Sequence, residues 1–398
     1  MAKKILIVFG TRPEAIKLAP VIKEIKKNPE LNGLVCVFRQ HGEMLDQVLR
    51  VFDIKPDFDL PISLTDKDLT ASGLSFFKKI KTLVQSGFGF LRFFLILKRE
   101  KPNLLMVQGD TSTVFLGGFL AFLFKIPIAH VEAGLRTYDK YAPFPEEMSR
   151  QLLGRLADIH FAPTENAKNN LLSENVPREK IHVVGNTEID ALLLINEKHK
   201  NKESEKKILE KLQKNHGLDL KPNKKLILVT AHRRESFGEG LKNIFEALKE
   251  IAGIRDDIQI IYPVHQNPNV HNLAHSILGG KENIRLTAPL SYELFTFLMG
   301  KAHFILTDSG GIQEAAPSLN KPLLVMREKT ERQEGVEAGV SKLVGTDKEK
   351  IVAAAIELLE NEEIYNAMIN KGNPYGDGTA SVKIVEVIER ILKRAPPI

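Results

Sequence analysis

Short hydrophobic segments alternate with longer helical ones along the first half of the chain. Segments of this length between helical stretches are typical of buried strands. They predict six strands, at residues 5–9, 34–38, 104–107, 128–131, 159–162 and 181–184. The alternation favours a parallel sheet with helices on both faces.

The same rhythm restarts after a charged stretch at residues 197–214, which has little hydrophobic periodicity and predicts a linking helix. Five further strands are expected, at residues 226–230, 258–262, 284–286, 304–307 and 323–325. We therefore predict an α/β protein with two Rossmann-like domains in tandem, at residues 1–187 and 188–378. A chain of 398 residues is comfortable for two such domains.

Composition narrows the class of protein. The net charge of +6 comes largely from lysines scattered over helical stretches, which favours solvated surfaces, and we expect no nucleic-acid partner. The single cysteine, Cys36, excludes a disulfide within the chain and fits the cytoplasm. The hydrophobic stretches 88–97 and 114–128 are interrupted by Arg92 and Lys125, so we expect no stable membrane insertion. Residues 1–4 lead directly into the first predicted strand, so we expect no secretory signal peptide.

The loop after the first strand has the sequence Gly10-Thr11-Arg12-Pro13-Glu14. Backbone N–H groups between a strand and a helix bind anions well, and Arg12 and Lys17 add positive charge. Only Gly10 is present where a dinucleotide fingerprint has three glycines, so we expect no NAD and no other cofactor. The alternative for Arg12 is a structural cap or ion pair.

Polar residues follow several of the predicted strands. Ligands of such sheets bind beyond the carboxyl ends of the strands. Asp110, Glu132 and Glu146 lie in predicted loops there and are candidates for general acid and base catalysis. Taken singly, each acid is more simply explained as a helix cap or an ion-pair partner, with Asp110 before Thr111 and Glu146 before Arg150 as examples.

A second set of candidates points to a phosphate group. His232 titrates near neutrality and lies beside two arginines, a setting that suits a departing phosphate. Ser309, Gly310 and Gly311 precede a helical segment and can cradle a diphosphate, the alternative being a plain tight turn. No metal site is expected, because the paired His or Cys spacing of zinc ligands is missing.

Several long motifs occur in one order along the chain. They are GTRPEAIK at 10–17, HVEAGLRT at 130–137, PFPEE at 143–147, GNT at 185–187, HRRE at 232–235, DSGGIQE at 308–314 and NPYGDG at 373–378. Together they resemble the UDP-N-acetylglucosamine 2-epimerase family nearly end to end. The resemblance is closer to the bacterial non-hydrolysing branch than to the hydrolysing one.

The resemblance implies a glycosyltransferase-B fold with the active site in the cleft between the domains, a C-terminal helix at 379–398 that completes the first domain, and a homodimer. It implies that UDP-GlcNAc and UDP-ManNAc interconvert through loss and re-addition of UDP, with a glycal intermediate. Proton transfer would fall to Asp110, Glu132 and Glu146, and His232 would steady the diphosphate. UDP would be held by Arg12, Lys17, Ser309, Gly310, Gly311 and Arg332, with Phe295 near uracil.

Three other functions stay open. They are a hydrolysing epimerase that releases ManNAc and UDP, an epimerase of a modified UDP-HexNAc, and, less favoured, a glycosyltransferase, for which the three acids would be surplus. Ala315 stands where the family has a second acid, so we expect a weaker grip on ribose. Segments 40–42 and 66–67 lack the family's arginines, and we predict that activation by a second UDP-GlcNAc is lost or altered.

Overall fold

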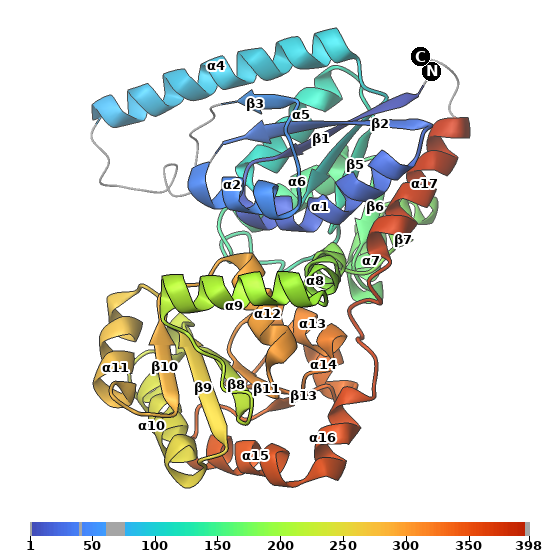
Figure 1. Cartoon of the computed structure of the whole chain (residues 1–398). Helices are drawn as coiled ribbons and strands as arrows, with labels where there is room; N and C mark the ends of the chain where they lie inside the picture. Colours follow the sequence, from blue (N-terminus) through green and yellow to red (C-terminus); the bar gives the residue numbers. More distant parts are fainter. Residues whose placement is uncertain (1, 40–41, 61–75, 395–398) are drawn as a thin grey trace. The chain divides into compact units, whose positions relative to one another are not determined.

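The computed structural model describes residues 2–39, 42–60 and 76–394, without the side chains of 76–86. Segments 40–41 and 66–67, on which the predicted loss of activation depends, lie outside the described residues. The chain divides into two compact units, Met1–Ala191 with Gly378–Ile398, and Leu192–Asp377 (Figure 1).

The first unit is built on a parallel sheet of seven strands in the order β3-β2-β1-β4-β5-β6-β7. The strands are β1 (Lys3–Phe9), β2 (Leu31–Phe38), β3 (Phe58–Leu60), β4 (Leu104–Gln108), β5 (Ile128–Val131), β6 (Ile159–Ala162) and β7 (Ile181–Val183). The six predicted strands are confirmed. The sequence analysis missed β3, which is three residues long and buries only Leu60.

Helices cover this sheet on both faces (Figure 1). They are α1 (Arg12–Lys27), α2 (Gly42–Val51), α4 (Phe76–Glu100), α5 (Ser112–Leu123), α6 (Glu146–Leu156), α7 (Glu165–Ser173) and α17 (Ala380–Arg394), with a 3-10 turn η1 (Arg178–Lys180). The C-terminal helix α17 lies beside α1. Its first turn is fixed by the buried Asp190, whose carboxylate accepts hydrogen bonds from the backbone N–H and the hydroxyl of Ser381 at 2.7 and 2.6 Å. Asp190 therefore caps a helix that is distant in sequence.

The second unit has a parallel sheet of six strands in the order β10-β9-β8-β11-β12-β13. The strands are β8 (Lys225–Thr230), β9 (Ile258–Pro263), β10 (Ile284–Thr287), β11 (Phe304–Thr307), β12 (Leu323–Val325) and β13 (Ser341–Leu343). The five predicted strands are confirmed. The sequence analysis missed β13, which has three residues and a single buried side chain, Ser341.

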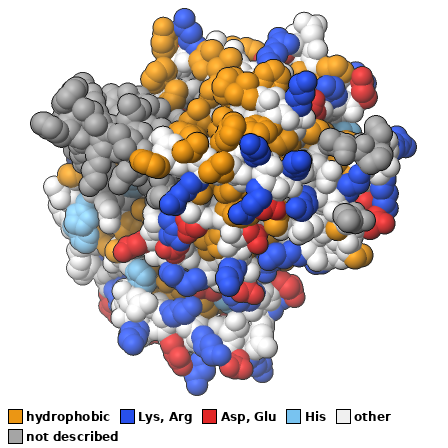
Figure 2. All heavy atoms as spheres, turned by 90° about the horizontal axis from the view of Figure 1, so that it is seen from above, with side chains coloured by type: hydrophobic (Ala, Val, Ile, Leu, Met, Phe, Trp, Pro, Cys, Tyr) orange, Lys and Arg blue, Asp and Glu red, His pale blue; other side chains and the backbone are white. Residues whose placement is uncertain are grey.

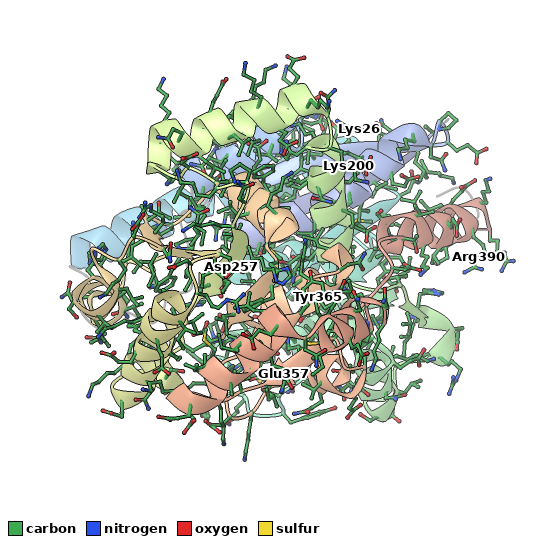
Figure 3. All side chains as sticks on the ribbon, turned by 60° about the horizontal axis from the view of Figure 1, so that its bottom comes forward. Lys26, Lys200, Asp257, Glu357, Tyr365 and Arg390 are labelled. Carbon is green, nitrogen blue, oxygen red and sulfur yellow. The ribbon has the colours of Figure 1, made fainter. Side chains whose placement is uncertain are left out.

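The helices of this unit are α9 (Lys202–His216), α10 (Glu239–Ile254), α11 (Pro268–Leu278), α12 (Tyr292–Lys301), α13 (Gly310–Ala315), α14 (Gln333–Glu337), α15 (Lys348–Glu360) and α16 (Glu362–Ile369), with 3-10 turns η2 (Arg234–Ser236) and η3 (Ala316–Leu319). Tyr365, which is labelled in Figure 3, lies on α16. Its ring stacks on His303 with ring centroids 4.4 Å apart, which fixes that helix against the start of β11.

The predicted linking helix at 197–214 is two helices. The first, α8 (Thr187–Lys198), carries the chain from one unit into the other, and α9 starts anew at Lys202. The break lies at Asn201, whose side chain accepts a hydrogen bond from the backbone N–H of Glu203 at 2.9 Å. Asparagine at a helix N-cap explains why one helix ends and another begins there. Within the described residues, no helix is long and apolar enough to cross a membrane.

Candidate functional site

The backbone N–H groups of the loop between β1 and α1 donate hydrogen bonds to a carboxylate of the same loop region, that of Glu14. The Glu14 carboxylate, 2% exposed, accepts hydrogen bonds from the backbone N–H of Gly10 at 2.6 Å and of Thr11 at 3.0 Å. It also accepts one from the Thr111 hydroxyl at 2.5 Å. Burial raises the pKa of Glu14, and these hydrogen bonds oppose that rise. The N–H groups of Gly10 and Thr11 are therefore occupied by Glu14 and are not open to a ligand anion, whereas the predicted role of Arg12 in phosphate binding stays a prediction.

Glu132 follows β5 and is held by two donors. Its carboxylate Oε2 forms an ion pair with Lys17 Nζ at 2.5 Å and accepts a hydrogen bond from the buried Gln108. Lys17 also lies 3.9 Å from Glu188, at the start of α8. The backbone of Glu132 has a φ of 64°, which a non-glycine residue adopts at a cost of about 1–3 kcal/mol. Such strain is common where a side chain is aimed for function.

Asp110 follows β4 and pairs with α6. Its carboxylate lies 2.7 Å from the guanidinium of Arg150, which also reaches Glu147 at 3.4 Å. Burial raises the pKa of Asp110, the charge of Arg150 lowers it, and the neighbouring Glu132 raises it again. Of the simpler explanations for Asp110, the ion pair is confirmed, with Arg150 as its partner, and the cap is wrong, because the hydroxyl of Thr111 caps α5. The suggested pair of Glu146 with Arg150 is also wrong, because Arg150 binds Asp110 and Glu147.

Glu146 begins α6, and its Oε2 is buried without a hydrogen-bond partner among the described residues. The next residue, Glu147, is fully buried and accepts hydrogen bonds from the backbone N–H groups of Thr137 and Tyr138. Burial would raise the pKa of Glu147, but its hydrogen bonds outweigh that effect and the pKa is lowered. Glu147 therefore anchors the loop between β5 and α6. Of the two acids, Glu146 is the one whose carboxylate has an oxygen available to a ligand.

The remaining predicted residue of the first unit is Arg12. It is exposed in the first turn of α1, whereas Lys17, one turn further on, joins the acid cluster. The structure thus brings together Lys17, Asp110 and Glu132 through their charges. Gln108 and Arg150, which complete this group, were missed by the sequence analysis, although Gln108 is the last residue of a strand and could have been read with Asp110.

In the second unit, a buried carboxylate joins the ends of two neighbouring strands. Asp308, which follows β11, accepts hydrogen bonds from the backbone N–H groups of His232 at 2.5 Å and Arg233 at 2.7 Å, just after β8. The imidazole of His232 stacks on His265 with ring centroids 5.4 Å apart. Burial is the main cause of a lowered pKa of His232, and the charge of Asp308 opposes it.

The α13 loop carries the predicted diphosphate donors. Ser309 is the N-cap of α13 without a side-chain capping bond, and Gly310 and Gly311 form its first turn, whose N–H groups have no partner within the helix. A Cβ on Gly310 would lie 2.9 Å from Cζ of Arg332, so only glycine lets that guanidinium approach the loop. Arg332 in turn pairs with Glu314 at 2.8 Å.

The motif at 373–378 makes hydrogen bonds to α13 and to the loop that carries Arg332. The buried Tyr375 hydroxyl accepts a hydrogen bond from the backbone N–H of Gly335 and donates one to the carbonyl of Arg332, both at 2.9 Å. Asn373 donates to the carbonyl of Glu314 at 2.7 Å. The motif therefore fixes α13 and the Arg332 loop against each other.

Phe295 and Ala315 lie at the same hydrophobic cluster. Phe295, on α12, is half-buried and packs against it, and Ala315 is 6% exposed within it. The role of Phe295 beside uracil, and the effect of Ala315 on ribose, stay predictions. No group of three or more His, Cys, Asp or Glu side chains is placed to hold a metal ion in the described part of the chain.

Comparison with known proteins identifies the family. The family model of UDP-N-acetylglucosamine 2-epimerase matches residues 23–389. The UDP-N-acetylglucosamine 2-epimerase of Campylobacter jejuni is 50% identical over 389 residues, 98% of each chain. A solved structure from Listeria monocytogenes has a TM-score of 0.84 and 41% identity, covering 100% of this chain and 98% of that one.

A second solved structure, UDP-GlcNAc 2-epimerase from Neisseria meningitidis bound to UDP-GlcNAc, has a TM-score of 0.80 and 45% identity, covering 97% of this chain and 100% of that one. The expected fold class, two Rossmann-like domains in tandem as in the glycosyltransferase-B fold, is confirmed. The chain belongs to the UDP-N-acetylglucosamine 2-epimerase family.

Proposed function

We propose that this protein interconverts UDP-GlcNAc and UDP-ManNAc by eliminating and re-adding UDP, without releasing the free sugar. A base removes the proton from C2, the C1–O bond breaks, and UDP departs with the bonding electrons, which leaves a C1=C2 double bond. In the return step a proton is delivered to the opposite face of C2 and a UDP oxygen bonds to C1. The sequence is redox-neutral and needs no NAD.

The observation that carries this proposal is the placement of Asp110 and Glu132 just after the neighbouring strands β4 and β5. Both carboxylates are partly buried, they interact through their charges, and each has its own cation, Arg150 or Lys17. Two acids in different environments can exchange the roles of acid and base, as a reaction on two faces of one carbon requires. The unpartnered oxygen of Glu146 gives a third group that can bind or protonate the sugar.

The second unit supplies the chemistry that the leaving group needs. Charge develops on the diphosphate as the C1–O bond breaks, and fixed donors stabilise it. We assign this role to His232, Ser309, Gly310, Gly311 and Arg332, and Arg12 stays a predicted UDP-binding residue. In this proposal the acids of the first unit transfer protons to and from the sugar, and the second unit stabilises the charge on UDP.

The test follows C2 exchange by proton NMR, with purified protein and UDP-GlcNAc in D2O. We expect deuterated UDP-ManNAc in equilibrium with UDP-GlcNAc, and little free sugar. Accumulation of ManNAc and UDP would instead indicate a hydrolysing epimerase, and no exchange would point to another UDP-HexNAc or to transfer to an acceptor. Glu132→Gln and Asp110→Asn should each slow exchange by about 10²–10⁴-fold, whereas Glu165→Gln, whose side chain on α7 is 66% exposed, should not.

We further propose that a second copy of the chain covers an apolar face of the first unit. Figure 2 shows hydrophobic side chains gathered on the face that carries α4. Four large hydrophobic side chains of the first unit, Phe88 and Leu91 on α4 and Phe122 and Leu123 on α5, are 52–65% exposed. A contiguous exposed patch of such residues marks an interface, and a homodimer would bury it.

Light scattering of the protein as it elutes from a size-exclusion column measures its mass and so tests for a dimer. We expect the mass of a dimer, and Phe122→Asp should give monomers. Ile254→Asp is the matched control, because Ile254 is 55% exposed in the second unit. A monomeric wild-type protein would contradict the proposal.

The burial of Cys36, the single thiol of the chain, fits our placement of the reaction in the cytoplasm.

A further inference from the structure

One carboxylate oxygen in the second unit is buried and lacks a hydrogen bond. Asp308 is fully buried, and its Oδ2 accepts the backbone N–H groups of His232 and Arg233. Its Oδ1 has no hydrogen-bond partner among the described residues. An unpaired buried carboxylate oxygen is unfavourable, so a donor is expected nearby. The Nδ1 atom of His232 lies 3.3 Å from Oδ1.

The imidazole of His232 lies beside this carboxylate, in a loop that is fixed at both ends. Its backbone is tied to Asp308, and its ring stacks on His265 with an interplanar angle of 11°. The far end of the same loop is fixed by an ion pair between Glu235 and the buried Arg327 at 2.5 Å. The ring therefore keeps one nitrogen toward Oδ1 of Asp308 and leaves the other for a ligand.

The charges around the ring differ in their effect. Burial, His265 and Arg233 disfavour the protonated imidazole, whereas Asp308 favours it. A ring with its proton on Nε2 alone would direct the lone pair of Nδ1 at a carboxylate oxygen, which is repulsive. Protonation at Nδ1 gives Oδ1 the donor that it otherwise lacks.

We propose that Asp308 is a positioning residue that keeps a proton on Nδ1 of His232 and so presents Nε2–H of the protonated ring to the departing diphosphate. The second half rests on the proposed function, whereas the protonation of Nδ1 does not. The arrangement follows the general logic by which a buried carboxylate orients an imidazole. No covalent bond to either residue is formed.

Nitrogen-15 NMR of the full chain, labelled at histidine, tests the first half. The signals of His232 are assigned by their loss in His232→Gln. We expect Nδ1 of the wild-type protein to carry a proton throughout the titration. In Asp308→Asn an amide –NH2 would face Nδ1, so the neutral ring should move its proton to Nε2. A wild-type ring with a bare Nδ1 overturns the proposal without any variant, even if Asp308→Asn fails to fold.

Addition of UDP tests the second half, because binding should shift the Nε2 signal of His232 and an unchanged signal would contradict the proposal. Asp308→Asn should lower kcat about 10–1000-fold, since losing an adjacent opposite charge lowers the pKa of an imidazole by about 1–3 units. The alkaline limb of the kcat profile should move to lower pH with little change in KM.

The control is Asp347→Asn, whose side chain caps α15; its pH profile should match the wild type. A merely structural role of Asp308 would lower the active fraction and leave the shape of the profile unchanged, which would overturn the proposal. If the wild type shows no C2 exchange while Nδ1 stays protonated, the proposed function fails and the assignment of the ring stands.

Discussion

The guanidinium of Arg150 on α6 binds the carboxylate of Asp110 after β4, with 2.7 Å between Nη2 and Oδ2. Asp110 lies in the connection between β4 and α5, and Arg150 lies on the helix that follows β5, so the pair links the two at the carboxyl edge of the sheet. Both side chains are mostly buried, at 18% and 25% exposure, and Coulomb attraction is stronger there than on an open surface. Arg150 is therefore placed to set the protonation of a proposed catalytic acid.

Replacing Arg150 by methionine should raise the pKa of Asp110. Burial already raises it, and Arg150 is the largest influence that holds it down. If Asp110 acts as a base, it must be ionised, so the acidic limb of the activity profile should move to higher pH by about 1–3 units. Kinetics across pH measure the shift. Arg155→Met, an exposed arginine on the same helix, is the control, and coincident profiles for all three proteins would contradict the prediction.

Glu14→Gln should destabilise the first unit. The amide keeps one acceptor oxygen but turns its –NH2 toward donors that now bind the carboxylate, Gly10 N–H and Thr11 N–H or the Thr111 hydroxyl. A buried donor left without an acceptor costs about 1–3 kcal/mol. Thermal unfolding should show a Tm lower by about 2–12 °C, at roughly 2–4 °C per kcal/mol.

Glu24→Gln is the matched control on α1. Glu24 pairs with Lys27, whose side chain is 72% exposed, and such a pair contributes about 0–1 kcal/mol. Equal losses in the two variants would contradict the prediction, because the buried hydrogen bonds of Glu14 would then contribute no more than a surface ion pair.

The positions of the strands and the polar residues after them were predictable because hydrophobic runs define parallel strands and topology gathers their carboxyl ends. The interaction partners of these polar residues were not all predictable. Arg150 on α6 binds Asp110 after β4, a pairing that sequence spacing does not encode. Glu14 is the third helical residue after Thr11, and this Thr-x-x-Glu spacing is a capping-box signal that the sequence analysis missed. The short β3 and β13 bury too few side chains to produce a pattern.

His130 should make stability depend on pH. It is buried on β5, its Nε2 lies 2.8 Å from the carbonyl of Gly109, and burial lowers its pKa from 6.5 to about 4. Between these values the unfolded chain binds a proton that the folded chain does not, so stability falls as pH falls from 6.5 toward 4. The slope is about 1.4 kcal/mol per pH unit, and the total about 3 kcal/mol.

His130→Gln keeps a donor for Gly109 and removes the titration. Denaturant unfolding at a series of pH values should show a shallower acid dependence in this variant, with His160 accounting for much of what remains because burial lowers its pKa to about 3. His271→Gln, at an exposed position, should leave the dependence unchanged. If stability depended on pH equally in the wild type and in His130→Gln, His130 would not be the cause of the acid dependence, which would contradict the prediction.

Tyr375→Phe should weaken UDP binding. The hydroxyl joins the Gly335 N–H to the Arg332 carbonyl, and its loss leaves a buried backbone N–H without an acceptor. We expect a stability loss of about 1–3 kcal/mol. Part of this energy holds the loop that carries Arg332, so calorimetry with UDP should also give a higher Kd, by roughly 3–30-fold if about 0.7–2 kcal/mol of binding energy is lost.

Tyr365→Phe separates the two effects. Its hydroxyl donates one hydrogen bond to the carbonyl of His303 at 3.1 Å, from a half-buried position, and it touches neither Arg332 nor α13 through any hydrogen bond of the described chain. This variant should lose less stability and keep the wild-type Kd for UDP. If Tyr375→Phe binds UDP as tightly as Tyr365→Phe does, the hydroxyl stabilises the fold without organising the UDP site, and Arg332 must be held by its ion pair with Glu314 instead.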